Sequence, residues 1–169
     1  PEMAPHPDSK PARVVKNLID IYNSHENANQ VVFMERGMSK TATRSEGEPG
    51  NKKKVTYPTF STMRDMIERL VQAGIPRDQI AVVDGKVKGA QRKAVADAMN
   101  SGKVRIVFGS TASLGVGVNM QNNLKAMHHM DAPWMPGDLE QRNGRGHRQK
   151  NQWNTVDEYR YLTDRIDGR

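Results

Sequence analysis

Three side chains near the end of the chain have a spacing that suits the binding of a polyphosphate. Gln141, Arg145 and Arg148 stand at positions i, i+4 and i+7, which lie on one face of an α-helix. Each arginine presents a planar fork of N–H donors that matches phosphate oxygens. The two forks and the carboxamide would together clamp a chain of phosphates. The same spacing also suits a solvated, basic helix end, so its context must decide.

A second polar segment follows a short apolar run over residues 104–108, which predicts a buried strand. This segment supplies hydroxyl groups at Ser110 and Thr111 and unobstructed backbone amides at Gly115 and Gly117. Backbone N–H groups in such a loop can hold a phosphate. Segments rich in glycine and serine also serve simply to turn the chain, and the segment alone leaves both interpretations open.

The elements that must position these two segments alternate along the chain. Apolar residues at helical spacing predict helices over residues 9–24, 58–73 and 90–99. Apolar runs rich in β-branched residues predict strands over residues 30–35, 80–84, 104–108, 126–131 and 157–162. This alternation predicts an α/β fold in three layers, a parallel sheet with helices on both faces. Ligands of such sheets bind at the carboxyl ends of the strands, where both polar segments begin.

Three stretches stand outside this alternation. Residues 1–11 contain four prolines and are predicted to form a linker, and residues 166–169 are interpreted as a truncated tail. Residues 37–57 are polar and rich in glycine, serine, threonine and lysine, so we expect a mobile loop inserted into a domain over residues 12–165. The lysine run at residues 52–54 would contact a nucleic-acid backbone or would simply be solvated.

Composition narrows the class of partner. The formal net charge of +7 favours a polyanion such as nucleic acid, a nucleotide or an acidic membrane surface. The chain has no cysteine, which excludes disulfides and thiolate metal sites, and we expect no metal site of its own. No apolar run approaches the roughly 20 residues that cross a bilayer, so no membrane contact is expected. These features are typical of a cytoplasmic protein.

The order of these motifs resembles the second RecA-like domain of superfamily-two helicases, in particular the Swi/Snf-type DNA translocases. Val31-Val32-Phe33 resembles motif IV, the segment from Ser110 to Gln121 resembles motif V, and the segment from Gln141 to Arg148 matches motif VI. Asp131 opens a segment like the one that precedes motif VI. The resemblance covers roughly residues 8–165. It is closest to the helicase halves of large phage and plasmid proteins that also carry an adenine-specific DNA methylase.

The resemblance implies catalytic roles for motif VI. Arg145 and Arg148 would be arginine fingers that reach the γ-phosphate of ATP, which an N-terminal RecA-like lobe would hold together with Mg²⁺. Such a finger can raise the rate of phosphoryl transfer by about 10³–10⁵. Gln141 would orient the nucleotide or the helix that carries the fingers.

The resemblance implies binding roles for motif V. Ser110 and Thr111 would hold a phosphate of the nucleic acid, which positions the strand without reading its sequence. Gly115 and Gly117 would let motif V approach the other lobe or the ATP. Asn119 would link motif V to motif VI.

One absence limits what these residues can do alone. The 169 residues contain no Gly-x-x-x-x-Gly-Lys-[Ser/Thr] phosphate loop, and no apolar strand precedes the acidic pair Asp157-Glu158. An ATPase of this class needs the lysine of that loop and an acidic magnesium ligand, so the isolated chain is predicted to be inactive.

The sequence therefore predicts the C-terminal lobe of an ATP-dependent DNA helicase or translocase in a bacterial or phage-infected cell. The implied partners are DNA, expected to be duplex, the N-terminal lobe and a fused DNA methylase. One alternative is a non-catalytic nucleic-acid-binding module with a degenerate helicase fold. Another is a stand-alone phosphotransferase that uses the basic helix directly.

Overall fold

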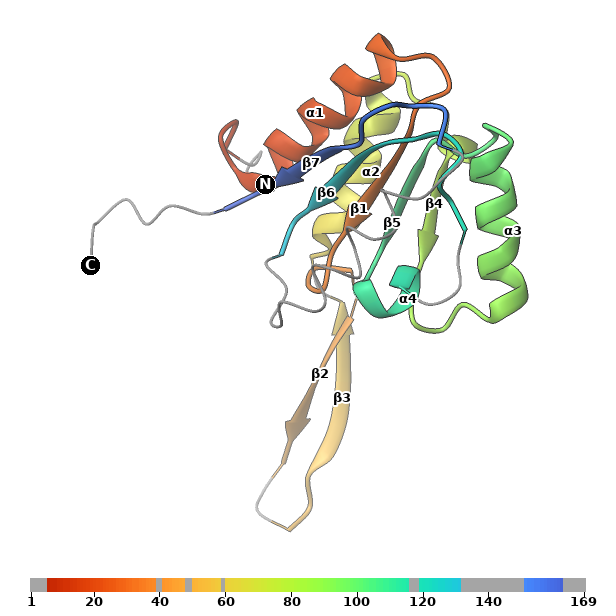
Figure 1. The fold of residues 1–169 in the computed structure, drawn as a ribbon. Coiled ribbons are helices and arrows are strands. Elements are labelled where there is room, and N and C mark those ends of the chain that lie inside the picture. Colours follow the sequence, from red (N-terminus) through yellow and green to blue (C-terminus); the bar gives the residue numbers. More distant parts are fainter. Residues whose placement is uncertain are drawn as a thin grey trace.

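The chain folds around a five-stranded parallel sheet (Figure 1). The computed structural model describes residues 6–38, 41–47, 50–58, 60–115, 119–131 and 151–162. The strands of the sheet are β1 (Asn29–Phe33), β4 (Ile80–Val83), β5 (Ile106–Gly109), β6 (Leu124–His129) and β7 (Asp157–Arg160). They lie in the order β4-β5-β1-β6-β7, and each pairing is parallel. All five predicted strands are therefore present.

Helices cover both faces of this sheet (Figure 1). They are α1 (Lys10–Ser24), α2 (Thr62–Gln72), α3 (Gly89–Asn100) and the short α4 (Thr111–Gly115), with a 3₁₀ turn at Arg77–Gln79. Leu18 of α1 and Met66 of α2 pack with Phe108 on one face. Met99 of α3 packs with Val107 on the other face, because neighbouring side chains of a strand point to opposite sides. The predicted three-layer α/β fold is confirmed.

The helix boundaries follow local capping signals. The Ser9 hydroxyl accepts a hydrogen bond from the Ala12 amide, so α1 begins at Lys10, inside the expected linker. Ser61 caps α2 in the same way, which places the helix start after residue 58. Phe60, which falls within the predicted helix over residues 58–73, precedes the observed helix and is 63% exposed. Gly74 ends the helix at φ +96°, as its type predicts.

Residues 37–57 do not form the loop that their composition suggested. β2 (Thr41–Glu46) and β3 (Lys53–Pro58) pair as an antiparallel hairpin. Threonine, valine and tyrosine favour strands, and Gly47 and Gly50 adopt positive φ angles between them. The hairpin extends past the carboxyl edge of the sheet (Figure 1). Because both of its faces meet solvent, its sequence lacks the apolar alternation of a half-buried strand.

A single arginine ties the opposite, amino edge of the sheet together. The Arg105 guanidinium donates hydrogen bonds to the carbonyl oxygens of Tyr22, His25 and Ala28 at 3.0, 2.7 and 3.2 Å. Its Cζ also lies 3.8 Å from the centroid of the Tyr22 ring. These contacts satisfy carbonyls at the end of α1 and in the turn that leads into β1, and they join that turn to β5.

His128 lies at the centre of a buried polar chain across the sheet. Its Nε2 faces Gln30 Oε1 at 3.0 Å and its Nδ1 faces the Tyr161 hydroxyl at 2.8 Å. Gln30 donates its amide to Leu18 O, and Asn17 donates to the Tyr161 oxygen. These directions require Nε2 to carry the proton and Nδ1 to accept from Tyr161. His129 stacks on Phe33 instead, so the two histidines point to opposite faces of the sheet, as neighbouring strand residues do.

Burial shifts the pKa values of two side chains in this hydrogen-bonded network, His128 and Tyr161. It lowers the pKa of His128 to about 3, with a smaller contribution from the neighbouring His129. It also raises the pKa of the Tyr161 hydroxyl to about 12, partly offset by the hydrogen bond from Asn17. Protonating His128 at Nδ1 would in addition remove the acceptor that Tyr161 uses. The ring is therefore neutral in the folded protein at physiological pH.

We expect this neutral ring to make stability fall in mild acid. Below pH 6.5, His128 of the unfolded chain binds a proton, whereas His128 of the folded chain binds one only below about pH 3. His128 alone should reduce the free energy of unfolding by about 1.4 kcal/mol for each pH unit below that value. Urea unfolding between about pH 6.5 and 5 measures the slope, before most carboxylates titrate. An identical slope in His128→Gln would contradict this account.

Candidate functional site at the carboxyl edge of the sheet

The carboxyl ends of β5, β1 and β6 lie side by side, since these three strands are neighbours in the sheet. The residues that follow them carry hydroxyl and carboxylate groups. They are Ser110 and Thr111 after β5, Glu35 after β1, and Asp131 after β6. Segments 76 and 96 residues apart in sequence are hydrogen-bonded here. Of the two polar segments predicted at this edge, the start of motif V is present there, and the motif VI segment lies outside the described residues.

Motif V begins with a capped turn of helix. Ser110 Oγ accepts a hydrogen bond from the Ser113 amide at 3.1 Å, and Ser113 Oγ accepts from the Ser110 amide at 2.9 Å. This reciprocal pair is a capping box built from two serines. Ser113 is buried, and its hydroxyl donates to Val83 O at 2.6 Å, which anchors α4 to the end of β4.

Glu35 occupies the amino end of α4. Its Oε1 accepts a hydrogen bond from the Thr111 amide at 2.8 Å and from the Thr111 hydroxyl at 2.5 Å. A carboxylate is favoured at this position because the free N–H groups of a helix start carry partial positive charge. The two residues that the sequence assigned to phosphate binding are therefore bonded within the protein, Thr111 to an anionic side chain and Ser110 to Ser113.

Asp131 joins the third strand end to this arrangement. Its Oδ2 accepts hydrogen bonds from the backbone amides of Glu35 at 2.8 Å and Arg36 at 3.2 Å. Asp131 thus fixes the residues that follow β1, among them Glu35. Glu35 then fixes the start of motif V through Thr111. The segment that contains motif VI begins directly after Asp131. The chain is described again from Asn151, whose side-chain amide donates to Leu124 O at 2.7 Å near the start of β6.

Gly109 brings motif V close to its neighbours. A Cβ at this position would lie 2.6 Å from Leu114 Cγ and 2.8 Å from Val83 O. Real Cβ atoms do not approach other atoms so closely, and the nearest backbone atom belongs to a paired strand. The glycine therefore allows α4 to fold back against the end of the sheet.

The remaining predicted site residues are only partly described. Gly115 is the last residue of α4. Asn119 is exposed, and its carbonyl accepts a hydrogen bond from the Asn100 side chain at 2.6 Å. Gly117, Gln141, Arg145 and Arg148 lie outside the described residues, so the predicted geometry of the arginine fingers and the link from Asn119 to motif VI stay predictions. Sequence reasoning missed Glu35, although an acid directly after a buried strand is a usable signal.

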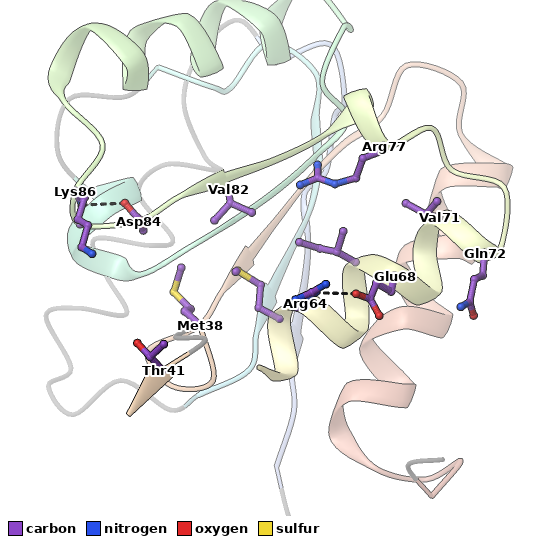
Figure 2. Close-up of a pocket in the computed structure, with 13 residues that line it drawn as sticks. Met38, Thr41, Arg64, Glu68, Val71, Gln72, Arg77, Val82, Asp84 and Lys86 are labelled. Carbon is purple, nitrogen blue, oxygen red and sulfur yellow. Dashed lines mark hydrogen bonds and ion pairs between the residues drawn. The ribbon is translucent and has the colours of Figure 1, made fainter. Parts of the chain in front are cut away.

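A separate groove of about 1220 Å³ lies beside the edge strand β4 (Figure 2). Its floor is apolar and includes Met63 and Val82. Met38 and Thr41 at the root of the hairpin and Lys86 after β4 also line it. Its other charged side chains are largely engaged, for example Arg64 with Glu68 at 2.8 Å. Of the predicted site residues that the structure describes, none lines this groove.

Two negative findings apply to the described residues alone. Among them, no group of three histidine, cysteine, aspartate or glutamate side chains is placed to hold a metal ion. Likewise, none of the helices in the described part of the chain is both long and apolar enough to span a bilayer.

Comparison with known protein families identifies the family of this chain. Residues 48–150 match the model of the helicase conserved C-terminal domain, and this range is more than half of the chain. The protein belongs to this family. The sequence has no significant match among curated proteins.

Solved structures support the fold assignment. The C-terminal part of the Fun30 ATPase domain superposes with a TM-score of 0.60 at 16% identity, covering 91% of this chain and 41% of that one. The E. coli DEAD-box protein SrmB, bound to the regulator of ribonuclease activity A, gives 0.56 at 14%, covering 89% and 70%. S. cerevisiae Dbp5 bound to RNA and ADP BeF3 gives 0.57 at 13%, covering 92% and 33%. The chain thus spans well under half of the Fun30 and Dbp5 chains.

We expect the Glu35 contact to matter for stability. Glu35→Ala leaves the Thr111 amide and hydroxyl without this acceptor and should lower the free energy of unfolding by about 1 kcal/mol, the usual effect of losing a helix cap. Glu35→Gln keeps an acceptor oxygen in place and should lose much less. Denaturant titration of the two variants against the wild-type chain gives the comparison, and equal losses would show that the hydrogen bonds are not the cause.

Proposed function

We propose that this chain is the C-terminal lobe of an ATP-dependent, Swi/Snf-like translocase that acts on duplex DNA. ATP and Mg²⁺ are held mainly by an N-terminal RecA-like lobe, which supplies the phosphate loop that the 169 residues lack. Arg145 and Arg148 reach the γ-phosphate across the closed lobes, and Gln141 orients them. Cycles of closure and opening move the protein along the nucleic acid.

The observation that supports the proposal best is the hydrogen-bonded edge formed by Asp131, Glu35 and Thr111. It joins the ends of β1, β5 and β6, and in the sequence motif V follows β5 and the segment that contains motif VI follows Asp131. A lobe that closes over this edge would meet both motifs together. The net charge of +7 suits a polyanionic track.

The choice of DNA, and of a fused adenine-specific methylase as partner, comes from the sequence resemblance. Of the three structures compared above, the Dbp5 structure contains RNA, so binding must be compared on both nucleic acids. Ser110 and Thr111 hold a phosphate, while Gly115, Gly117 and Asn119 form the remainder of motif V that faces the nucleotide. The alternative is a nucleic-acid-binding module that never contacts ATP. A phosphate-loop lysine in the N-terminal lobe would favour the translocase.

The arginine fingers can be tested in the two-lobed protein. Arg148→Ala should reduce DNA-stimulated ATP hydrolysis by about 10³-fold or more, since the guanidinium charge that stabilises the negatively charged, transferring phosphoryl group is lost. Affinity for DNA should remain within a few-fold of the wild type. ATPase rates and DNA binding are measured on the same preparation, with Arg13→Ala on the exposed face of α1 as the matched control.

Full turnover by Arg148→Ala would remove the role assigned to this residue. The isolated chain should show no ATPase activity of its own. Hydrolysis by the purified chain would instead support the stand-alone phosphotransferase.

Glu35 provides a test of the phosphate contact at motif V. If a nucleic-acid phosphate binds at Ser110 and Thr111, it must approach the Glu35 carboxylate, which repels it. Glu35→Gln keeps the hydrogen bonds and removes the charge, so affinity for nucleic acid should rise several-fold at low salt. Fluorescence anisotropy with labelled duplex DNA and RNA measures the change. Unaltered affinity would place the phosphate contact elsewhere.

A further inference from the structure

The β2–β3 hairpin has no hydrophobic core of its own. It consists of two strands of six residues that pair with each other and with no other strand. Its largest apolar side chains, Val55 and Tyr57, are 38% and 41% exposed. A two-stranded ribbon of this kind is at best marginally stable in water. At about 3.4 Å per residue, it reaches about 20 Å from its root.

The root of the hairpin is fixed to the core of the domain. The Ser61 hydroxyl donates to Gly37 O at 3.1 Å, and the Met63 amide donates to the same oxygen at 3.1 Å. Met63 is buried against the sheet, and Met38 packs against the same cluster. Both ends of the ribbon are thus tied to the start of α2. This anchoring gives the hairpin a defined direction past the carboxyl edge, where the proposed nucleic-acid contact also lies (Figure 1).

The charges on the hairpin are unevenly neutralised. Glu46 is the partner of Arg44, which also lies over the Tyr57 ring at 5.7 Å. The lysines at residues 52–54 are exposed, and no ion pair joins them to any residue that the structure describes. Three ammonium groups therefore project into solvent from three consecutive residues at the far end of the ribbon.

The chemistry of one hairpin face complements a phosphate backbone. Cross-strand partners share a face, so Lys54 lies with Ser45, and the next pair along is Thr43 with Thr56. The Thr43 and Thr56 hydroxyls are 3.2 Å apart and hydrogen-bonded. Lysine and hydroxyl side chains are the groups that proteins use to contact phosphate and sugar. Among the described residues this face has no acidic side chain, whereas Lys53 lies on the opposite face, where its cross-strand partner is Glu46.

We infer that the β2–β3 hairpin is a second nucleic-acid contact of this protein, in which Lys52, Lys53 and Lys54 bind the phosphate backbone. The inference rests on the proposed function for the identity of the polyanion. It adds a contact site outside motif V. Thr41 at the hairpin root and Lys86 after β4 line one groove (Figure 2).

Charge removal on the isolated chain tests the inference. The triple variant Lys52→Gln, Lys53→Gln, Lys54→Gln is compared with a control, Lys16→Gln, Lys93→Gln, Lys103→Gln, which removes the same charge from α1, α3 and the amino edge. Binding of duplex DNA, single-stranded DNA and duplex RNA is measured by anisotropy over a range of salt. All six lysines are exposed, and circular dichroism checks that both variants fold.

The slope of log K against log salt measures how many phosphate contacts the hairpin lysines make. Loss of three phosphate contacts should lower the slope of log K against log salt by about 2–3 and weaken binding by about tenfold or more. The control should change the slope by less than about one. Replacing the same three lysines by arginine should preserve the wild-type slope. The three nucleic acids show whether the contact depends on the kind of backbone.

Each other outcome overturns the inference in a distinct way. Equal losses in both triple variants would mean general electrostatic attraction without a contact at the hairpin. Unchanged binding together with self-association of the hairpin variant would mean that the lysines only prevent strand edges from pairing. If the wild-type chain binds nucleic acid and the hairpin variant binds equally well, the hairpin role fails while the proposed function stands. If the wild-type chain binds none of the three, the nucleic-acid role in the proposed function fails as well.

Discussion

Two carboxylates hold together the strand ends on which the site of this domain depends. Asp131 accepts hydrogen bonds from the backbone amides of Glu35 and Arg36, which follow β1. Glu35 in turn accepts hydrogen bonds from the amide and the hydroxyl of Thr111. Hydrogen bonds to a charged acceptor are stronger than those between neutral groups, and the helix start adds a favourable field. Without them, the residues that follow β1, β5 and β6 would have no hydrogen bonds joining Asp131, Glu35 and Thr111. The packed sheet supplies the scaffold, and these contacts set the position of the start of motif V relative to Asp131.

Much of the fold could be predicted because its signals are local. A short segment is enough to show the buried run from Gln30 to Phe33. The same is true of the helical spacing of apolar residues in α1. Ser9 and Gly74 act through their immediate neighbours, and both behave as their types suggest. The position of the site followed from a general property of parallel sheets, which place ligand contacts at the carboxyl ends of strands.

The features that escaped prediction depend on distant residues or on solvent. Glu35 meets Thr111 across 76 residues, and no spacing rule connects them. The hairpin has no buried face, so its polar composition is the same as that of a loop, and only strand propensity and two glycines distinguish it. Phe60 falls inside the predicted helix over residues 58–73 because it is apolar. The Ser61 cap instead begins α2 at Thr62, so Phe60 lies before the helix.

Arg105 gives the two edges of the sheet different mechanical properties. Three carbonyls and an aromatic ring enclose its guanidinium, so the amino edge is cross-linked by bonds that all engage one rigid planar group. The carboxyl edge is held instead by the acidic side chains of Asp131 and Glu35, which accept hydrogen bonds from residues after neighbouring strands. A force applied at the carboxyl edge would therefore be transmitted through the sheet to its amino edge. There, Arg105 joins the turn before β1 to β5.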